Sequence, residues 1–222
     1  KYLNDCKYQK NVTSMDVPRE IREAKIKDIY TDDKQREKVI KWILNYIKEY
    51  KKGNFGKGLY LHGNFGCGKT YLLAAMFNEL AKENVRSVIT YWPEYLRSLK
   101  SSYSSSSSYE FKDKYNEVKY AKLLLIDDLG AEGVTSWSRD EILGTILQYR
   151  MQEHLPTFIT SNLNLKELEE HLSVSTANKS ERVKAVRIIE RIKQLTIDAE
   201  MIENRGSILR VSIFLCYLGY SY

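Results

Sequence analysis

The chain has little cysteine and no apolar run long enough for a membrane span, and both shortages exclude whole classes of protein. Its 222 residues contain three cysteines, Cys6, Cys67 and Cys216, too few and too scattered for a disulfide framework or a Cys-x-x-Cys metal pair. A reducing compartment, the cytoplasm, is therefore expected. The apolar run at residues 208–218 is too short to cross a bilayer, and no signal peptide begins the chain, so we expect no membrane partner.

The length and composition are those of one globular domain. Hydrophobic residues make up 43% of the chain and charged residues 29%, which is ordinary for a protein that buries a substantial core. The formal net charge of +6 suits an acidic partner such as nucleic acid, and it suits an unspecialised basic surface equally well.

One segment between a strand-like run and a helix-like run has the complete pattern of a phosphate-binding loop. The segment consists of Gly63, Asn64, Phe65, Gly66, Cys67, Gly68, Lys69 and Thr70, and Tyr71 follows it. Its glycines let backbone amides turn toward a β-phosphate, and the amino terminus of the next helix adds partial positive charge. Lys69 is expected to reach the β- and γ-phosphates, and the Thr70 hydroxyl to ligate Mg²⁺. Residues 63–71 therefore predict binding of ATP or ADP.

Strand-like and helix-like patterns alternate along the rest of the chain, which predicts a parallel sheet covered by helices on both faces. Expected strands are 57–62, 87–91, 123–126 and 157–160, and expected helices are 32–50, 71–82, 94–100, 139–152 and 182–195. The predicted fold class is thus α/β, with a three-layer α/β/α P-loop NTPase core. The serine-rich residues 101–108 predict a mobile loop, with hydroxyl contacts to a nucleic-acid backbone as the alternative.

Polar side chains follow two of the predicted strands. Asp127 and Asp128 end a buried apolar strand, so Asp127 is expected to hold the Mg²⁺ shell and Asp128 to act as general base on the attacking water. Asn162 follows the next strand and is predicted to contact the attacking water or the γ-phosphate. The alternative for Asn162 is a turn residue that starts the following helix.

The helix predicted at residues 182–195 carries two arginines one turn apart, Arg187 and Arg191. Its apolar stripe is expected to consist of Val183, Val186, Ile189, Ile192 and Leu195. A solvated basic face is one interpretation of the arginines. The other is an arginine finger that acts on the ATP of a neighbouring subunit, because the site otherwise lacks a cation for the transferring phosphoryl group. Arg187 is the first candidate for this role and Arg191 the second.

Several motifs occur together in an order that resembles one family. GNFGCGKTYLLAA, LLLIDDLGAE, TSWSRDEILGTILQYRM, LPTFITSN and RVKAVRIIERIK are similar to the AAA+ ATPase domain of bacterial replicative-helicase loaders of the DnaI type, with DnaC and the transposition helper IstB as more distant resemblances. The resemblance runs from about residue 17 to about residue 203. It implies an ATPase of DNA replication that binds a hexameric DnaB-type helicase, helps to place it on single-stranded DNA, and assembles with itself through the ATP site.

By the same resemblance, residues 91–100 and the loop beyond fall in an insertion that faces the single strand. The residues whose chemistry suits contacts to bases and phosphates are Tyr95, Arg97, Lys100 and Tyr103. Helix packing and surface solvation are their alternative roles. An IstB-like transposition helper and a nucleotide-gated adaptor with little hydrolysis stay open as alternative functions.

The chain also departs from the family pattern at both ends. The first residue is Lys1 and not Met, and the cysteines for the amino-terminal zinc-binding domain of these loaders are lacking, so residues 1–30 are predicted to be a linker from a missing amino-terminal domain. Residues 31–205 are the expected ATPase domain, with no or minimal helical lid. Residues 206–222 are an atypical apolar tail, interpreted as either an added strand or a non-native extension.

Overall fold

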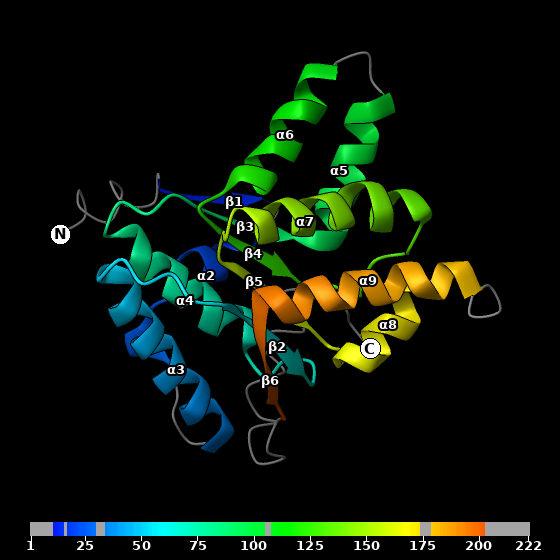
Figure 1. The fold of residues 1–222 in the computed structure, drawn as a ribbon. Helices are drawn as coiled ribbons and strands as arrows, with labels where there is room; N and C mark the ends of the chain where they lie inside the picture. Colours follow the sequence, from blue (N-terminus) through cyan, green and yellow to red (C-terminus); the bar gives the residue numbers. More distant parts are fainter. Residues whose placement is uncertain (1–10, 16, 30–33, 105–107, 174–178, 203–222) are drawn as a thin grey trace, which may run out of the picture.

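The computed structural model describes residues 11–15, 17–29, 34–104, 108–173 and 179–202, and its centre is a sheet of six parallel strands (Figure 1). The strand order is β1-β3-β4-β5-β2-β6. The strands are β1 (Val12–Met15), β2 (Gly58–Gly63), β3 (Ser87–Tyr91), β4 (Leu123–Asp127), β5 (Thr157–Ser161) and β6 (Thr196–Met201). The helical segments are α2 (Arg19–Arg22), η1 (Ile26–Asp28), α3 (Lys34–Lys51), α4 (Lys69–Ala81), α5 (Trp92–Ser104), α6 (Ser108–Tyr120), η2 (Trp137–Gly144), α7 (Thr145–Gln152), α8 (Leu165–Leu172) and α9 (Lys179–Leu195).

Alternate residues of the strands point to two separate cores, one on each face of the sheet. In β4, Leu123 and Leu125 pack with α2, α3 and α4, whereas Leu124 and Ile126 pack with α5 to α9. Tyr60 of β2 likewise faces the second group of helices. Strands buried on both faces explain why their sequences are apolar throughout. The three-layer α/β/α fold with a parallel central sheet is therefore confirmed.

The edges of the sheet contain strands that the sequence analysis did not predict. Within the proposed linker 1–30, β1 pairs with β3, and the segment after it buries Ile21 and Ala24 at 3% and 1% exposure. Asn78 of α4 donates hydrogen bonds to the carbonyl of Ala24 at 2.9 Å and to that of Arg22 at 3.1 Å. The described residues 11–15 and 17–29 are thus part of the domain and not a linker. At the other edge β6 pairs with β2. The tail 206–222 lies outside the described residues.

The serine-rich stretch is helical where the structure describes it, so the prediction of a loop over 101–108 is wrong there. Helix α5 continues to Ser104, and α6 begins at Ser108. Ser101 and Ser102 each donate a hydroxyl hydrogen bond to the carbonyl of Ser98 at 2.9 Å, so their polar groups are satisfied within the helix. Small side chains also permit close packing of α5 against α6, where Lys114 donates to the Ser102 hydroxyl at 3.4 Å.

Helix α9 buries the later part of the predicted stripe but not its start. Ile189, Ile192 and Leu195 are buried as predicted, whereas Val183 is 44% exposed, and Ala185 and Ile188 are buried without having been predicted. The helix predicted at 139–152 begins at Trp137, and its first half, η2, is a π-helix. Among the described residues, no helix combines the length and the apolar character that a membrane span requires.

A buried arginine ties α6 and α7 to the sheet. Arg150 is 0% exposed, and its guanidinium donates to the carbonyls of Ala121 and Pro156, each at 2.7 Å, and to the Thr157 hydroxyl at 2.8 Å. Burial lowers the pKa of this guanidinium, which still keeps its charge. One side chain thus satisfies buried backbone carbonyls from two segments of the chain.

Replacing Arg150 with Met is expected to lower the free energy of unfolding by about 3 kcal/mol, because buried carbonyl oxygens lose charged donors that water does not replace. Urea denaturation measures this. The matched control is Arg97→Met, which removes an exposed ion pair with Glu94 and is expected to cost about 0.5 kcal/mol or less. Equal effects of the two substitutions would contradict the tethering role of Arg150.

Candidate nucleotide-binding site

The phosphate loop connects β2 to α4 at the carboxyl edge of the sheet, and backbone conformation requires glycine at its turns. Gly63, Gly66 and Gly68 have φ angles of 132°, 73° and 84°, in the region that other residues rarely adopt. A Cβ on Gly63 would also lie 1.8 Å from the carbonyl oxygen of Met201 in β6. Gly68 is the N-cap of α4. The loop can therefore fold back over the start of a helix whose free amides suit an anion.

Lys69 is 7% exposed, and its ammonium group lies among acceptors from two parts of the site. It donates to the carbonyls of Gly63 at 2.9 Å and Asn64 at 2.7 Å, and to Asn162 Oδ1 at 2.9 Å. These three oxygen acceptors match the three donors of an ammonium group, and Cys67 Sγ lies 3.7 Å away as a weaker fourth contact. The acceptors around the Lys69 ammonium group are neutral. Negatively charged phosphate oxygens would therefore bind this group more strongly at the same place.

Asp127, at the end of β4, receives two hydroxyl groups on one carboxylate oxygen. Thr70 and Thr160 each donate to Asp127 Oδ1 at 2.6 Å. Burial, the largest influence, raises the pKa of Asp127 to about 6, and the two hydroxyl hydrogen bonds oppose this rise. The predicted proximity of Thr70 and Asp127 is thus present in the structure.

Asp128 and Asn162 meet across the ends of β4 and β5. Asn162 Nδ2 donates to Asp128 Oδ1 at 2.7 Å, while its Oδ1 accepts from Lys69. Asp128 has a φ of 58°, and its amide donates to the Thr160 hydroxyl at 2.9 Å. Burial raises the pKa of Asp128, and Lys69 and Asn162 oppose the rise. The Asn162 side chain therefore links Lys69 of the phosphate loop to Asp128.

Asn162 is not the residue that starts the next helix. Asn164 caps α8 with Oδ1, which accepts from the amides of Lys166 and Glu167 at 3.0 Å, and the Asn164 amide donates to the Glu167 carboxylate at 2.8 Å. The turn interpretation of Asn162 is therefore wrong, and its side chain is directed into the site.

The donor set at Thr70 and Asp127 fits Mg²⁺. A hydroxyl and a carboxylate are hard oxygen ligands, and Mg²⁺ is commonly held by one or two protein oxygens together with phosphates and water. The described residues contain no group of three or more His, Cys, Asp or Glu that would form a separate metal cage. Thr70 and Asp127 could therefore hold a metal ion beside a bound nucleotide.

The two arginines of α9 differ in their surroundings. Arg191 is partly buried and donates from Nη1 to the carbonyl of Gly144 at 2.9 Å, at the junction of η2 and α7. Burial, and then the neighbouring Arg187, lowers the pKa of Arg191. Arg187 is exposed. Of the two candidates for a finger, Arg191 binds its own chain and Arg187 faces solvent.

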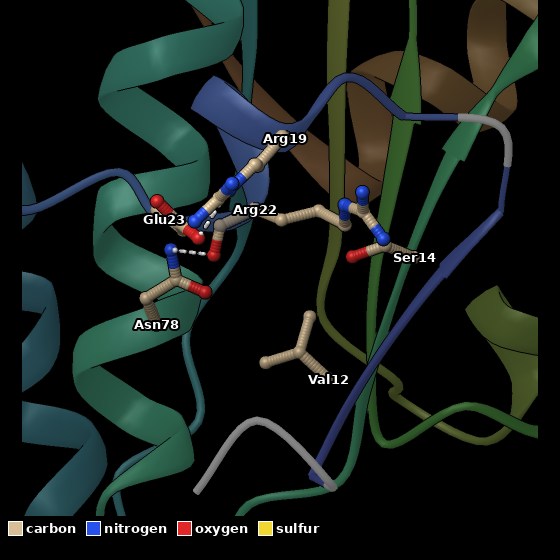
Figure 2. Close-up of a pocket in the computed structure, with 6 residues that line it drawn as sticks. All are labelled: Val12, Ser14, Arg19, Arg22, Glu23 and Asn78. Carbon is tan, nitrogen blue, oxygen red and sulfur yellow. Dashed lines mark hydrogen bonds and ion pairs between the residues drawn. The ribbon is translucent and has the colours of Figure 1, made fainter. Parts of the chain in front are cut away.

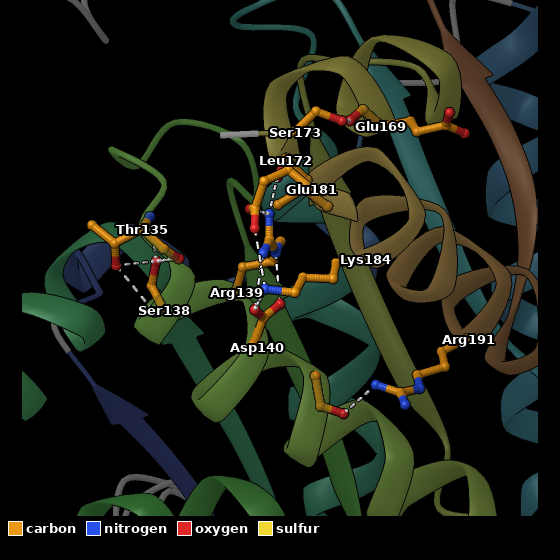
Figure 3. Close-up of polar contacts among 11 residues, drawn as sticks. Thr135, Ser138, Arg139, Asp140, Glu169, Leu172, Ser173, Glu181, Lys184 and Arg191 are labelled. Carbon is orange, nitrogen blue, oxygen red and sulfur yellow. Dashed lines mark hydrogen bonds and ion pairs between the residues drawn. The ribbon is translucent and has the colours of Figure 1, made fainter. Parts of the chain in front are cut away.

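A charged cluster fixes α9 against η2 and α8 (Figure 3). The Arg139 guanidinium, 1% exposed, forms ion pairs with Asp140 at 2.6 Å and Glu181 at 2.7 Å and donates to the Leu172 carbonyl at 3.0 Å. Lys184 lies 3.3 Å from Asp140 and 3.1 Å from Glu181. The position of α9, and with it that of Arg187, is thus set by contacts among three helical segments.

The residues predicted to contact nucleic acid do not form one surface. Tyr95 is 1% exposed, stacks near Trp92 with ring centroids 5.4 Å apart, and belongs to the core, so it is not available to a base. Arg97 and Lys100 are exposed, and Arg97 forms an ion pair with Glu94. The side chain of Tyr103 lies outside the described residues. The helix-packing alternative is therefore correct for Tyr95.

Sequence reasoning missed Thr160 and Arg36. Thr160 joins Asp127 to the Asp128 amide, and its only signal was a hydroxyl near the end of a predicted strand. Arg36 of α3 donates from Nη2 to the carbonyl of Cys67 at 3.1 Å. No local pattern marked it, because its partner is distant in sequence.

A hollow of 470 Å³ lies between β1, the segment that begins with α2, and α4 (Figure 2). It is lined by Val12, Ser14, Arg19, Arg22, Glu23 and Asn78. Three strands separate β1 from β2 in the sheet order, and Arg19 is already paired with Glu23 at 2.8 Å. The hollow therefore has no part in the nucleotide chemistry.

The fold and the site together define a P-loop domain of the AAA+ ATPase class. Residues 37–178 match the family described as the bacterial DnaA ATPase domain, and the chain belongs to this family. The sequence is 41% identical over 189 residues to the replicative helicase loader DnaI of Bacillus subtilis (strain 168), covering 85% of this chain and 60% of the relative. The chain thus spans about 60% of that relative's length.

Two solved structures are similar along most of the chain. A crystal structure of DnaI has a TM-score of 0.77 and 47% sequence identity, covering 86% of this chain and 97% of that one. A putative primosome component from Streptococcus pyogenes serotype M3 has a TM-score of 0.72 and 30% identity, covering 89% and 97%.

Asp127→Asn is expected to stabilise the metal-free protein above pH 6. A carboxyl whose folded pKa exceeds its unfolded value retains its proton in the folded state, so its contribution to stability falls as pH rises from about 4 to about 6. At pH 8 the variant should be about 2 kcal/mol more stable than wild type, with the difference shrinking toward pH 4.

Urea denaturation at several pH values without Mg²⁺ measures this difference. Asp113→Asn, at an exposed position, serves as control and should leave stability unchanged at every pH. A gain for Asp127→Asn that does not vary with pH would refute the account of the buried carboxylate.

Proposed function

We propose that the chain is the ATPase domain of a replicative helicase loader, which binds ATP with Mg²⁺ and hydrolyses it slowly in isolation. The observation that carries the proposal is the chain of contacts from Lys69 through Asn162 to Asp128, with Thr70 on Asp127 beside it. A structural role alone does not call for a buried lysine, a buried acid and a half-buried acid around a glycine-rich loop.

Each polar group has a defined task in this proposal. The amides of residues 63–71 bind the β-phosphate, Lys69 neutralises the β- and γ-oxygens, and Thr70 and Asp127 hold the metal. When bound, Mg²⁺ neutralises charge that develops on the phosphates. Asp128 accepts a hydrogen bond from the attacking water, and Asn162 orients that carboxylate.

The missing positive charge is proposed to come from Arg187 of a second copy of the chain. Arg187 is exposed on a helix that the Arg139 cluster holds in place, whereas Arg191 binds Gly144 of its own chain. An exposed arginine held on a fixed helix can reach the γ-phosphate of a neighbour without rearrangement. Self-assembly would therefore complete the site, with Arg191 as the second candidate.

The partners are proposed from the relatives. The Bacillus subtilis relative is a replicative helicase loader, which supports a DnaB-type helicase as partner and a cytoplasmic location. Single-stranded DNA is proposed as a second partner of the α5–α6 region, through Arg97, Lys100 and Tyr103. A nucleotide-gated adaptor with little hydrolysis and an IstB-like transposition helper are the alternatives.

Lys69→Ala is expected to abolish nucleotide binding, since the phosphates lose their cation. Arg187→Ala should leave binding intact and lower assembly-stimulated turnover by about 10³-fold or more, the usual effect of a finger. Calorimetry measures the affinity, and phosphate release at protein concentrations that permit self-association measures the turnover.

Lys193→Ala, at an exposed position of the same helix, is the matched control and should retain full turnover. Turnover of Arg187→Ala equal to wild type under these conditions would exclude Arg187 as the finger.

DNA binding separates the loader from its alternatives. A loader should bind single-stranded DNA with an affinity that differs between ATP and ADP, whereas a transposition helper should prefer duplex DNA. The same titrations with Asp128→Asn, which is expected to bind ATP without hydrolysing it, test the adaptor. If nucleotide dependence survives in this variant, binding and not hydrolysis controls the grip on DNA.

A further inference from the structure

The carbonyl of Cys67 is bound by a side chain from outside the phosphate loop. Arg36, in the second position after the start of α3 at Lys34, donates from Nη2 to this oxygen at 3.1 Å. A charge-assisted hydrogen bond of this kind is stronger than a neutral one and directs the carbonyl toward α3.

The direction of this carbonyl determines that of the next amide. A trans peptide unit is planar, so its C=O and N–H point in opposite directions, and the described chain contains no cis peptide. When the Cys67 oxygen faces α3, the Gly68 N–H faces away from α3, into the loop. Gly68 is the N-cap of α4, and its carbonyl accepts from the Leu72 amide at 3.0 Å. Its amide is thus one of the helix-terminal donors available to an anion.

The side chain of Cys67 restricts the same peptide from the other side. It is 1% exposed and lies in the core cluster that includes Val39 and Ile43 of α3. Residue 67 is therefore fixed by its side chain in the core and by its carbonyl on Arg36. Gly68, with no side chain and a φ of 84°, would otherwise be free to rotate this peptide.

Lys69 does not supply this restraint. Its ammonium group contacts Cys67 only at Sγ, at 3.7 Å, and otherwise binds Asn162 and the carbonyls of Gly63 and Asn64 at the opposite end of the loop; in the proposed function it exchanges these carbonyls for phosphate oxygens. Arg36 binds an oxygen that no phosphate contact requires, so its hydrogen bond is compatible with both states.

We propose that Arg36 is a positioning residue of the phosphate loop: it holds the Cys67 carbonyl toward α3 and thereby aims the Gly68 amide at the β-phosphate of a nucleoside diphosphate or triphosphate. The inference rests on the proposed nucleotide binding. It adds a residue outside the loop motif that sets phosphate affinity without touching phosphate.

The experiment compares Arg36→Met, Arg36→Lys and Lys38→Met in the full chain. A fluorescent ADP analogue gives the affinity, and the Gly68 amide resonance of the nucleotide-free protein reports the orientation of the peptide. Arg36→Met should shift the Gly68 resonance and weaken ADP binding about tenfold to a hundredfold, the effect of one charge-assisted hydrogen bond. Arg36→Lys, which still donates, should recover most of the affinity.

Lys38→Met, an exposed change on the same helix, controls for loss of charge and should change neither readout. An unchanged Gly68 resonance in Arg36→Met would overturn the inference, and so would an equal loss of affinity in Lys38→Met.

If wild type does not bind ADP, the proposed function fails, and the Gly68 resonance still decides the role of Arg36. If Arg36→Met does not fold, the resonance and affinity of Arg36→Lys decide it, with values equal to wild type supporting the restraint and a full loss overturning it.

Discussion

Two opposite charges buried at one edge of the sheet, the Lys69 ammonium and the Asp127 carboxylate, are the constraint on which the site depends. Burial of a charge is costly unless polar groups surround it. Here the partners come from the loop after β2, from the start of α4 and from the ends of β4 and β5. The parallel register of β2, β4 and β5 brings these ends together, so the sheet topology determines the chemistry.

The same constraint explains how nucleotide binding can act beyond the phosphate loop. Lys69 holds loop carbonyls and Asn162 without phosphate, and Asn162 also holds Asp128. If Lys69 moved to a phosphate, Asn162 would lose its hydrogen bond from Lys69 and keep the one that it donates to Asp128. A bound nucleotide would thereby change the contacts of Asn162 at the end of β5.

The sequence predicted those parts of the structure that depend on residues close together in the chain. The phosphate loop, the strand that ends in Asp127 and the position of Asn162 follow from short-range pattern and strand order. Features set by distant contacts were missed. The sequence does not show whether Tyr95 is buried or exposed, because its chemistry suits both. The serine-rich stretch is helical, with hydroxyls that donate to carbonyls one turn back. Segment β1 is a strand because it pairs with β3. Arg36 likewise finds its partner 31 residues away.

The most direct test of the account is a structure of the chain with Mg²⁺ and a non-hydrolysable ATP analogue. The account predicts that Lys69 leaves the carbonyls of Gly63 and Asn64 for phosphate oxygens, and that Thr70 and Asp127 turn from each other to the metal. A nucleotide bound elsewhere, or a loop in which Lys69 keeps its backbone partners beside the bound phosphates, would contradict it.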